Sequence, residues 1–377
     1  MKHSTPILVC ILPLSLNNIL SAANWRVFLY ADSSDNLSDM LIKNIAEVIQ
    51  GKPTDEVEFY IQLHAYYQTG LRCQVTQQGL QVIEEIQLTG DNKQDFINGA
   101  QWAFADNTSN YTMLIISNHG WGILDPSWNE QAHEWQVNET GLSNTCMTNT
   151  SRNHPIESSE EHKLHRGFLF TAKPRAYLSN PRLFEGLQHI AGTVLHNKID
   201  VLAFDTCMGD MLEIGYGAAP HAHYLIGNQS CSLLDGFPYK DIVQALNKKP
   251  TPRKLIKEMV HAFDVYYLQN DESGIYTHGA LDLTYIQDTC TALDGIIKQL
   301  LAMPELATSL IKVCNNCPRF CLWPMYTDPI AWAHLIEQEI EDIPQSDSLI
   351  ALKDALQKFY TAIPYLIVAR CGGFSTI

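Results

Sequence analysis

Two apolar segments, residues 114–117 and 201–204, end just before residues that could carry out acyl transfer. The first segment is followed by Asn118-His119-Gly120 and the second by Asp205-Thr206-Cys207. A cysteine attacks a carbonyl group as the thiolate, and a nearby imidazole can accept its proton and later protonate the leaving amine. We therefore predict that His119 and Cys207 form a catalytic pair.

Gly120 is the second notable residue of the first segment end. A glycine lets backbone approach closely, so its N–H, together with that of Cys207, could stabilise a developing oxyanion. Each residue also has an ordinary interpretation when taken alone. A buried cysteine is often a small core residue, and a histidine at a strand end is often only a hydrogen-bonded polar group.

These residues must be positioned by the elements around them, and the chain alternates between strand and helix patterns. Short apolar runs predict strands, and apolar residues at three- and four-residue steps predict amphipathic helices. The predicted strands cover residues 26–31, 57–63, 111–117, 199–204 and 224–227, and the predicted helices cover residues 37–49, 93–104, 183–194 and 211–216. This alternation predicts an α/β fold with a mainly parallel sheet and helices on both faces. In such a sheet, ligands bind at the carboxyl ends of the strands, where His119 and Cys207 lie.

Two further regions complete this division of the chain. Residues 125–166 are polar and lack apolar periodicity, which predicts an exposed inserted loop within a catalytic domain of residues 24–250. Beyond it, residues 251–377 form an α-rich C-terminal extension that completes the sheet or packs on it. There we expect helices at 252–268, 287–302 and 346–360, a strand at 275–283, and a last strand within 369–377.

Composition excludes two classes of function. The 377 residues include 25 basic and 41 acidic residues, a formal net charge of −16, whereas a nucleic-acid-binding protein needs clustered Lys and Arg. No apolar run reaches the ~18 residues that a membrane-spanning helix needs. Residues 1–23 combine Lys2, an apolar stretch and the small residues Ser21-Ala22-Ala23, as in a signal peptide. We therefore expect a secreted or periplasmic protein, with a buried first strand as the alternative.

Ten cysteines include the closely spaced group Cys314, Cys317 and Cys321. Such spacing can hold a metal ion or an iron–sulfur cluster, but no fourth ligand is evident nearby, so disulfides or buried thiols are the preferred interpretation. The histidines of the inserted loop, at 154, 162 and 165, could likewise bind a metal ion, and solvated side chains are the preferred alternative.

The ordered set of these segments resembles the clostripain-like cysteine peptidases, a family of the caspase-type clan CD. The paired features are the apolar block that ends at His119-Gly120 and the later apolar block that ends at Cys207. The resemblance extends over roughly residues 25–285 and includes the segments 25–31, 234–239 and 280–283. The chain departs from the family pattern at Thr206 and Phe237 and in its separation of 88 residues between His119 and Cys207.

The resemblance implies a caspase-like fold and an endopeptidase in which His119 is the base and acid and Cys207 the nucleophile. It also implies that Asp205 and Asp235 form an acidic pocket for the Arg or Lys that precedes the cleaved bond. A carboxylate is the partner that a desolvated guanidinium needs. The alternatives are that Asp235 is a turn residue before Gly236 and that Asp205 only fixes its loop.

Members of this family often cut themselves between the catalytic His and Cys, and the basic residues that offer such cleavage points here are Arg152, Lys163, Arg166, Lys173 and Arg175. An exposed loop that merely contains basic residues is the alternative. The chemistry itself implies no cofactor. Some members depend on calcium, for which the acidic turn with Asp32 and Asp35 is a candidate and solvated turn residues are the alternative. Two rival functions stay open: an inactive caspase-like binding protein, and a thiol or metal protein centred on Cys314, Cys317 and Cys321.

Overall fold

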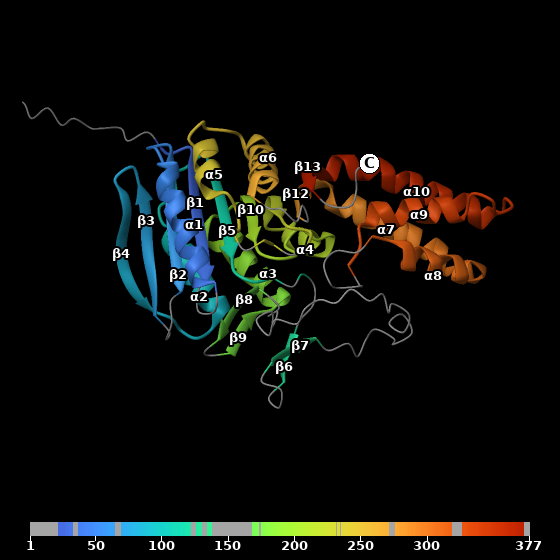
Figure 1. The fold of residues 1–377 in the computed structure, drawn as a ribbon, viewed down its shortest axis with the longest axis horizontal. Coiled ribbons are helices and arrows are strands. Elements are labelled where there is room, and N and C mark those ends of the chain that lie inside the picture. Colours follow the sequence, from blue (N-terminus) through green and yellow to red (C-terminus); the bar gives the residue numbers. More distant parts are fainter. Residues whose placement is uncertain are drawn as a thin grey trace, which may run out of the picture.

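A nine-stranded mixed sheet forms the centre of the protein (Figure 1). The computed structural model describes residues 22–32, 37–64, 69–120, 122, 126–129, 134–137, 168–172, 175–230, 232–233, 235–270, 276–318 and 326–372. The strands of the sheet, in spatial order, are β13 (Ile367–Gly372), β12 (Thr277–Asp282), β11 (Ala222–Gly227), β10 (Ile199–Asp205), β5 (Tyr111–Ser117), β1 (Trp25–Asp32), β2 (Val57–His64), β3 (Thr69–Thr76) and β4 (Gly79–Gln87).

The five central strands, from β11 to β2, pair in parallel, and the strands at both edges pair antiparallel. The predicted α/β fold with a mainly parallel centre is therefore confirmed. The sequence analysis missed the hairpin of β3 and β4, which extends the sheet at one edge. The segment 369–377, predicted to include a last strand, contributes the second half of β13, which closes the other edge.

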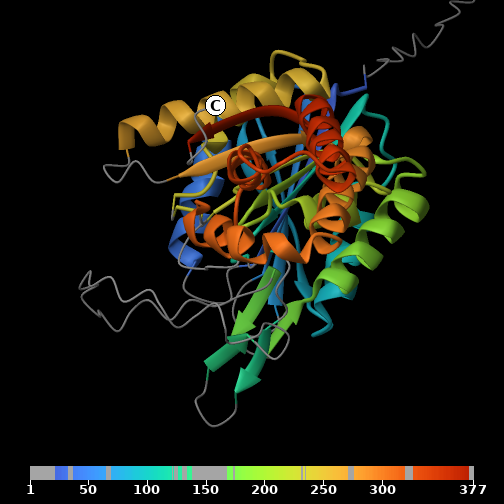
Figure 2. The ribbon, with the colours of Figure 1, turned by 90° about the vertical axis from the view of Figure 1, so that its right-hand side faces the viewer.

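Side chains of the central strands alternate between two cores, as the period of two in a strand requires. In β1, Val27 and Leu29 contribute to one core, whereas Phe28 and Tyr30 contribute to the other. All eight residues of β1 are buried, because helices cover both faces of the sheet (Figures 1 and 2). This explains why the central strands appear in the sequence as continuous apolar runs.

Each face of the sheet is covered by its own set of helices. On the first core lie α1 (Ser38–Gly51), α5 (Tyr239–Leu246) and α6 (Pro252–Asn270). On the second lie α2 (Asn92–Ala103), α3 (Asn180–His189) with the π-helical turn Ile190–Val194 that continues it, α4 (Leu212–Ala218) and α7 (Ile286–Leu301). The sequence analysis predicted these helices except α5.

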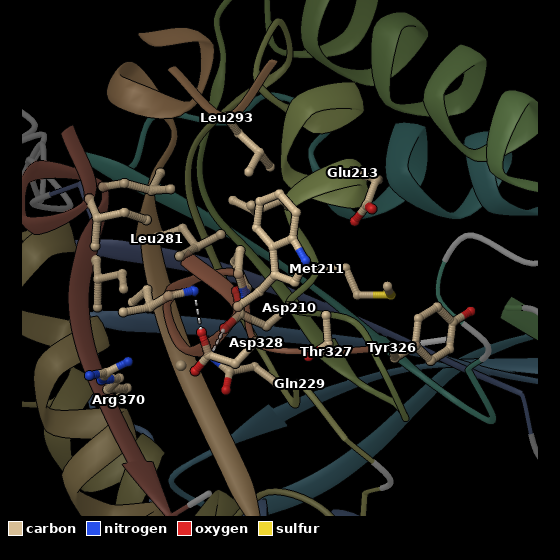
Figure 3. Close-up of a pocket in the computed structure, with 18 of the residues that line it drawn as sticks. Asp210, Met211, Glu213, Gln229, Leu281, Leu293, Tyr326, Thr327, Asp328 and Arg370 are labelled. Atoms are coloured by element: carbon tan, nitrogen blue, oxygen red, sulfur yellow. Dashed lines mark hydrogen bonds between the residues drawn. The ribbon is translucent and has the colours of Figure 1, made fainter. Parts of the chain in front are cut away.

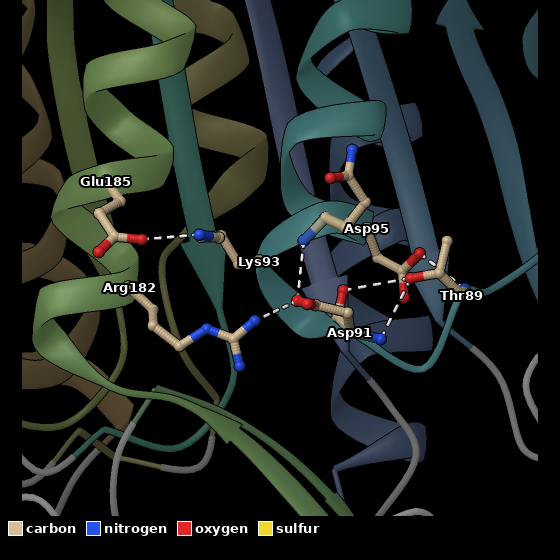
Figure 4. Close-up of polar contacts among 7 residues, drawn as sticks. Thr89, Asp91, Lys93, Asp95, Arg182 and Glu185 are labelled. Carbon is tan, nitrogen blue, oxygen red and sulfur yellow. Dashed lines mark hydrogen bonds and ion pairs between the residues drawn. The ribbon is translucent and has the colours of Figure 1, made fainter.

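Polar contacts fasten α2 to α3 at the surface of the second layer (Figure 4). Asp91 caps α2 by accepting a hydrogen bond from the N–H of Gln94 and also pairs with Arg182 of α3. One turn further along α3, Glu185 Oε2 lies 2.6 Å from Lys93 Nζ of α2. Exposed ion pairs of this kind contribute little to stability, so the buried apolar contacts supply most of the packing energy.

The C-terminal helices form a third core at one end of the molecule (Figure 1). It is built from α7, α8 (Ala307–Asn316), α9 (Pro329–Glu339) and α10 (Asp347–Leu366), with short 3₁₀ turns at Leu283–Tyr285 and Pro304–Leu306. The same region supplies β12 and β13, so it both extends the sheet and packs beside it. The sequence analysis missed α8 and α9.

Two small hairpins lie between β5 and α3: β6 (Pro126–Asn129) with β7 (Glu134–Val137), and β8 (Phe168–Ala172) with β9 (Arg175–Leu178). The prediction that residues 125–166 lack regular structure is therefore wrong for the first hairpin, whose register pairs Trp128 with Trp135. Of the predicted cleavage points, Arg175 begins β9 and pairs with Ala172. The other predicted cleavage points and the loop histidines lie outside the described residues.

Most of the predicted signal peptide, residues 1–21, also lies outside the described residues. Among the helices that the structure describes, none has the length and apolar character needed to cross a membrane.

Candidate active site

The two predicted catalytic residues follow neighbouring strands of the sheet. β10 pairs with β5 in parallel, and the register places Asp205 beside Ser117. His119 and Cys207 each lie two residues beyond these paired positions, so they leave the sheet side by side at its carboxyl edge. Adjacent strands are about 4.8 Å apart, so the backbones of the two residues leave the sheet close to each other.

The loops that carry the two residues touch each other at Gly120. A β-carbon on Gly120 would lie 2.2 Å from the carbonyl oxygen of Cys207 and 2.6 Å from Thr206 Oγ1, so only glycine fits here. The backbone N–H groups of Gly120 and Cys207 both act to lower the pKa of the Cys207 thiol. These are the two N–H groups that the sequence analysis predicted as oxyanion donors.

Burial governs the chemistry of the Cys207 sulfur. It raises the pKa of the thiol, against the lowering effect of the N–H groups of Ser232 and Gly120. The N–H of Ser232 lies 3.1 Å from Sγ. Because burial outweighs these donors, the sulfur is a thiol at neutral pH unless a base takes its proton. His119, at the end of the neighbouring strand, is the base that the sequence analysis predicts.

His119 is itself positioned by the residue before it. The Asn118 side chain donates a hydrogen bond to the carbonyl oxygen of Asp32 at 2.7 Å and accepts one from the N–H of His119 at 2.5 Å. On the far side, the Asn180 side chain donates to the carbonyl oxygen of Gly122 at 2.9 Å. The loop is thus held from both ends, by β1 and by α3.

The end of β11 braces the nucleophile loop, which comprises residues 206–210. The sequence analysis missed this contribution of β11. The N–H groups of Met208 and Asp210 donate to the carbonyl oxygens of Ser230 and Asn228 at 2.9 and 3.1 Å. The Asn228 side chain donates to the carbonyl oxygen of Thr206 at 3.2 Å. Met208 adopts a positive φ of 53°, a conformation that this bracing maintains. The signal was available, because polar residues follow directly on the predicted strand 224–227.

Asp205 lies deep beneath the loop that follows β11. Its side chain is 3% exposed, and its Oδ2 accepts hydrogen bonds from the hydroxyl groups of Tyr239 at 2.8 Å and Ser117 at 3.4 Å. Burial raises the pKa of the carboxyl group to about 6, although the Tyr239 hydroxyl acts in the opposite direction. Asp205 thus links β10 to α5 and to β5, and its assignment to a substrate pocket stays a prediction.

Next to Asp205 lies Asn44, a buried side chain without hydrogen-bond partners. Asn44 of α1 is fully buried, and neither polar atom of its side chain has a hydrogen-bond partner; Asp205 Oδ1 also lacks one. Both side chains adjoin Gly236, where a β-carbon would lie 2.8 Å from Asp205 Oδ2 and 3.0 Å from Asn44 Nδ2. Buried polar groups usually have partners, so unused bonding capacity at this point suits a ligand with several N–H donors.

Asp235 lies on the outer side of the same loop and already has partners. Its Oδ1 is 2.6 Å from Lys43 Nζ of α1, and its Oδ2 accepts a hydrogen bond from the Tyr266 hydroxyl of α6 at 2.8 Å. The side chains of Asp235 and Lys43 are 43% and 45% exposed. The Lys43 hydrogen bond lowers the pKa of Asp235, so the carboxylate is ionised at neutral pH. Gly236, which follows Asp235 in the chain, lies against the Asp205 side chain, so the two carboxylates flank the same glycine. The sequence analysis did not anticipate the contact of Asp235 with Lys43.

The described residues contain no group of three or more His, Cys, Asp or Glu that could hold a metal ion. Asp32, one half of the candidate calcium turn, is buried with its Oδ2 3.8 Å from His64 Nδ1, and Asp35 lies outside the described residues. In the cysteine group, Cys314 is exposed, whereas Cys317 is buried with its sulfur 2.6 Å from Thr327 Oγ1. Cys321 lies outside the described residues.

Comparison with known proteins gives a family match over part of the chain and a likeness of fold. Residues 178–360 match the sequence model of the clostripain family, a stretch that includes Cys207 but begins after His119. No curated protein matches the chain.

Solved structures supply the second comparison. A secreted C11 cysteine protease from Bacteroides thetaiotaomicron, solved with an irreversible peptide inhibitor, is 14% identical, with a TM-score of 0.63 over 93% of this chain and 85% of its own. An inactive zymogen C11 protease from Parabacteroides distasonis is 15% identical, with a TM-score of 0.58 over 93% of this chain and 84% of its own. At these identities the likeness is one of fold.

Proposed function

We propose that this chain, a clostripain-like cysteine peptidase, is an endopeptidase that cuts after Arg or Lys, with Cys207 as nucleophile and His119 as general base. The observation that carries the proposal is the arrangement at the carboxyl edge of β5 and β10. There the Ser232 N–H lies 3.1 Å from the Cys207 sulfur, and Gly120, next to His119, lies against the Cys207 backbone. Sulfur, base and N–H donors are the groups that acyl transfer needs.

The reaction follows from these groups. As Sγ of Cys207 attacks the carbonyl carbon, the thiol proton passes to His119, and the N–H groups of Gly120 and Cys207 stabilise the oxyanion. The C–N bond then breaks, His119 gives its proton to the leaving amine, and a thioester remains. Water attacks the thioester and loses a proton to His119. The C–S bond breaks, and the proton returns to the sulfur as the acid product leaves.

The preference for Arg or Lys is supported by the charges around Gly236. Asp235 and Glu47 offer carboxylates at the surface, and Asp205 and Asn44 offer unpartnered oxygen atoms below them. A guanidinium or ammonium group that enters here exchanges water for charged partners and satisfies buried acceptors. An acidic or aliphatic side chain would satisfy none of them.

No step of this mechanism calls for a cofactor, because thiol, imidazole, backbone N–H groups and water carry every bond change. If calcium acts on the enzyme, we propose that it stabilises the fold and does not take part in the reaction.

We further propose that the protein is exported and that it cuts itself between β7 and β9. Residues 1–23 have the parts of a signal peptide, and the structurally similar Bacteroides protease is described as secreted. Self-cleavage would fall after Arg152, Lys163, Arg166 or Lys173, and not after Arg175, because that residue is held in the β8–β9 ladder. N-terminal sequencing of secreted protein tests export. Mass spectrometry of the wild type and Cys207→Ala after incubation tests self-cleavage, and identical intact masses would refute it.

The central test uses four fluorogenic peptides that differ only in having Arg, Lys, Asp or Leu before the reporter. The proteins compared are the wild type, Cys207→Ala, and Cys314→Ala as a control at an exposed thiol. We expect turnover of the Arg or Lys peptide by the wild type and the control, and none by Cys207→Ala. Turnover of the Asp or Leu peptide would refute the acidic pocket. No turnover of any peptide, with calcium and reductant present, would favour an inactive caspase-like binding protein.

A further inference from the structure

A cavity lies beside the loop that carries Cys207 (Figure 3). It has a volume of about 290 Å³ and lies between α4, β12 and the C-terminal helices. Its walls are mainly apolar, with Leu281, Leu293, Ile297, Trp332 and Ile363 among the lining residues. This volume is at the lower end of the range for small-molecule sites, roughly 300–1,000 Å³, so one compact apolar group fills it.

A buried carboxylate, Asp210, faces this apolar space. Asp210 is 6% exposed, and its Oδ1 has no hydrogen-bond partner. Its Oδ2 has only a long hydrogen bond from the Gln229 side chain, at 3.4 Å. Burial raises the pKa of Asp210 to about 7. A buried oxygen atom without a partner is costly, and a ligand that supplies a donor would remove that cost.

The fold makes room for this carboxylate. A β-carbon on Gly279 of β12 would lie 2.2 Å from Asp210 Oδ2, so a larger residue there would displace the side chain. Figure 3 shows Asp210, Gln229 and Asp328 grouped together, away from Leu293. The polar end of the cavity is therefore separate from its apolar end.

Charge at the cavity favours a cation. Among the described residues that line it, three are carboxylates (Asp210, Glu213 and Asp328) and only Arg370 is basic. Asp328 is already used as the cap of α9, accepting hydrogen bonds from the N–H groups of Ile330 and Ala331. Glu213 is exposed, so Asp210 is the buried carboxylate of this lining that has bonding capacity to spare.

The cavity shares a wall with the catalytic loops. Met211 and Tyr326 line it and also contact Gly122, where a β-carbon would lie 2.2 Å from Met211 Sδ and 3.3 Å from the Tyr326 hydroxyl. Cys207 and Met211 pack against the buried pair of Met208 and Tyr326. A group bound in the cavity would thus press on the layer of side chains that supports the nucleophile.

We propose that this cavity is a binding site for a compact apolar group that carries an ammonium ion, with Asp210 as its counter-ion. Two sources share this chemistry: a free organic amine, and the N-terminus of a peptide that begins with an apolar residue. Binding is independent of the proposed function, whereas any effect of the ligand on turnover rests on Cys207 being the nucleophile.

Calorimetric titration of the full chain tests the proposal, with Cys207→Ala as the background so that no probe is hydrolysed. The probes are 2-phenylethylamine, its neutral isostere 2-phenylethanol, and leucyl-glycine amide with a free or an acetylated N-terminus. We expect saturable binding of the amine and roughly tenfold or more weaker binding of the alcohol, as a charged hydrogen bond predicts. Binding of the free but not the acetylated dipeptide would identify a peptide N-terminus as the ligand. Binding of 2-phenylethylamine alone would identify a free organic amine as the ligand.

Two further variants locate the site. Asp210→Asn should remove the preference for amine over alcohol, and the exposed control Asp288→Asn should retain it. Leu293→Trp, which narrows the cavity and leaves the carboxylate in place, should weaken all ligands that bind and so serves if Asp210→Asn fails to fold. Equal binding of amine and alcohol, absence of binding by every probe, or amine binding unchanged in both Asp210→Asn and Leu293→Trp would overturn the proposal. Peptide hydrolysis by the wild type would be unaffected by that outcome.

Discussion

Replacing Lys43 by methionine should improve cleavage after Arg and Lys. Lys43 Nζ lies 2.6 Å from Asp235 Oδ1 and 3.3 Å from the Tyr266 hydroxyl, so it occupies the carboxylate that a basic substrate side chain would use. Methionine keeps most of the apolar stem of lysine and removes the competing charge. The substrate cation then meets an Asp235 whose Oδ1 has lost its lysine partner, while its Oδ2 still accepts from the Tyr266 hydroxyl.

The magnitude follows from the exposure of the pair. The two side chains are 45% and 43% exposed, and such an ion pair contributes about 0.2–1 kcal/mol. The removal of this competition corresponds to a KM lower by about 1.4- to 5-fold for an Arg peptide, with kcat unchanged. The effect should shrink in high salt, which screens charges at the surface.

Steady-state kinetics with matched Arg and norleucine peptides measure this effect. Lys240→Met, at an exposed position of α5, is the control for a general loss of positive charge. The expected result is a lower KM for the Arg peptide in Lys43→Met alone, with no change for norleucine. A higher KM for Arg would mean that Lys43 holds Asp235 in its binding position, and an equal change for both peptides would refute the assignment of Asp235 to the pocket.

The remaining predictions concern the oxyanion donors, the buried acid and calcium. Gly120→Ala should lower kcat by roughly a hundredfold or more, because the new methyl group would overlap the Cys207 carbonyl and move an oxyanion donor; an unchanged kcat would contradict this. The pKa of Asp205 is raised to about 6, so its contribution to stability is fully present below about pH 4 and is lost as the pH rises through 6, a loss of about 3 kcal/mol. The free energy of unfolding, measured by denaturation at each pH from 4 to 7, should therefore depend less on pH in Asp205→Asn than in the wild type. The exposed control Asp241→Asn should keep the wild-type dependence. The same pH dependence in the wild type and Asp205→Asn would contradict this. Treatment with EDTA should leave kcat unchanged, and a loss of kcat that calcium alone restores would show a metal role in turnover.

The central fold was predictable because both faces of the sheet are covered. Strands such as β1 and β5 are apolar along most of their length, and the helices between them repeat apolar residues at helical steps. The edge hairpin was not predictable in the same way. Most residues of β4 are exposed, so no alternation marks a buried face. Its position depends on pairing with β3, a tertiary effect.

The candidate site likewise contains residues that the local sequence predicts and residues that depend on tertiary contacts. His119 and Cys207 follow apolar strands directly, so their position was evident from the sequence. Lys43 and Tyr266 could not be assigned to the site, because they reach Asp235 from two helices that are remote in the chain. The bonding state of Asp205 likewise depends on Tyr239, whose helix was missed. Residues that act through contacts between distant helices leave no local pattern.

The pairing of β5 with β10 has a consequence for the continuity of the chain. The two strands are neighbours in the centre of the sheet, yet the connection between them runs through small hairpins outside it. The backbone ladder and the two buried cores, and not the connecting peptide, hold the halves together. Two separately produced fragments, one ending after β7 and the other beginning before β8, should therefore assemble into one particle, with each supplying one residue of the pair.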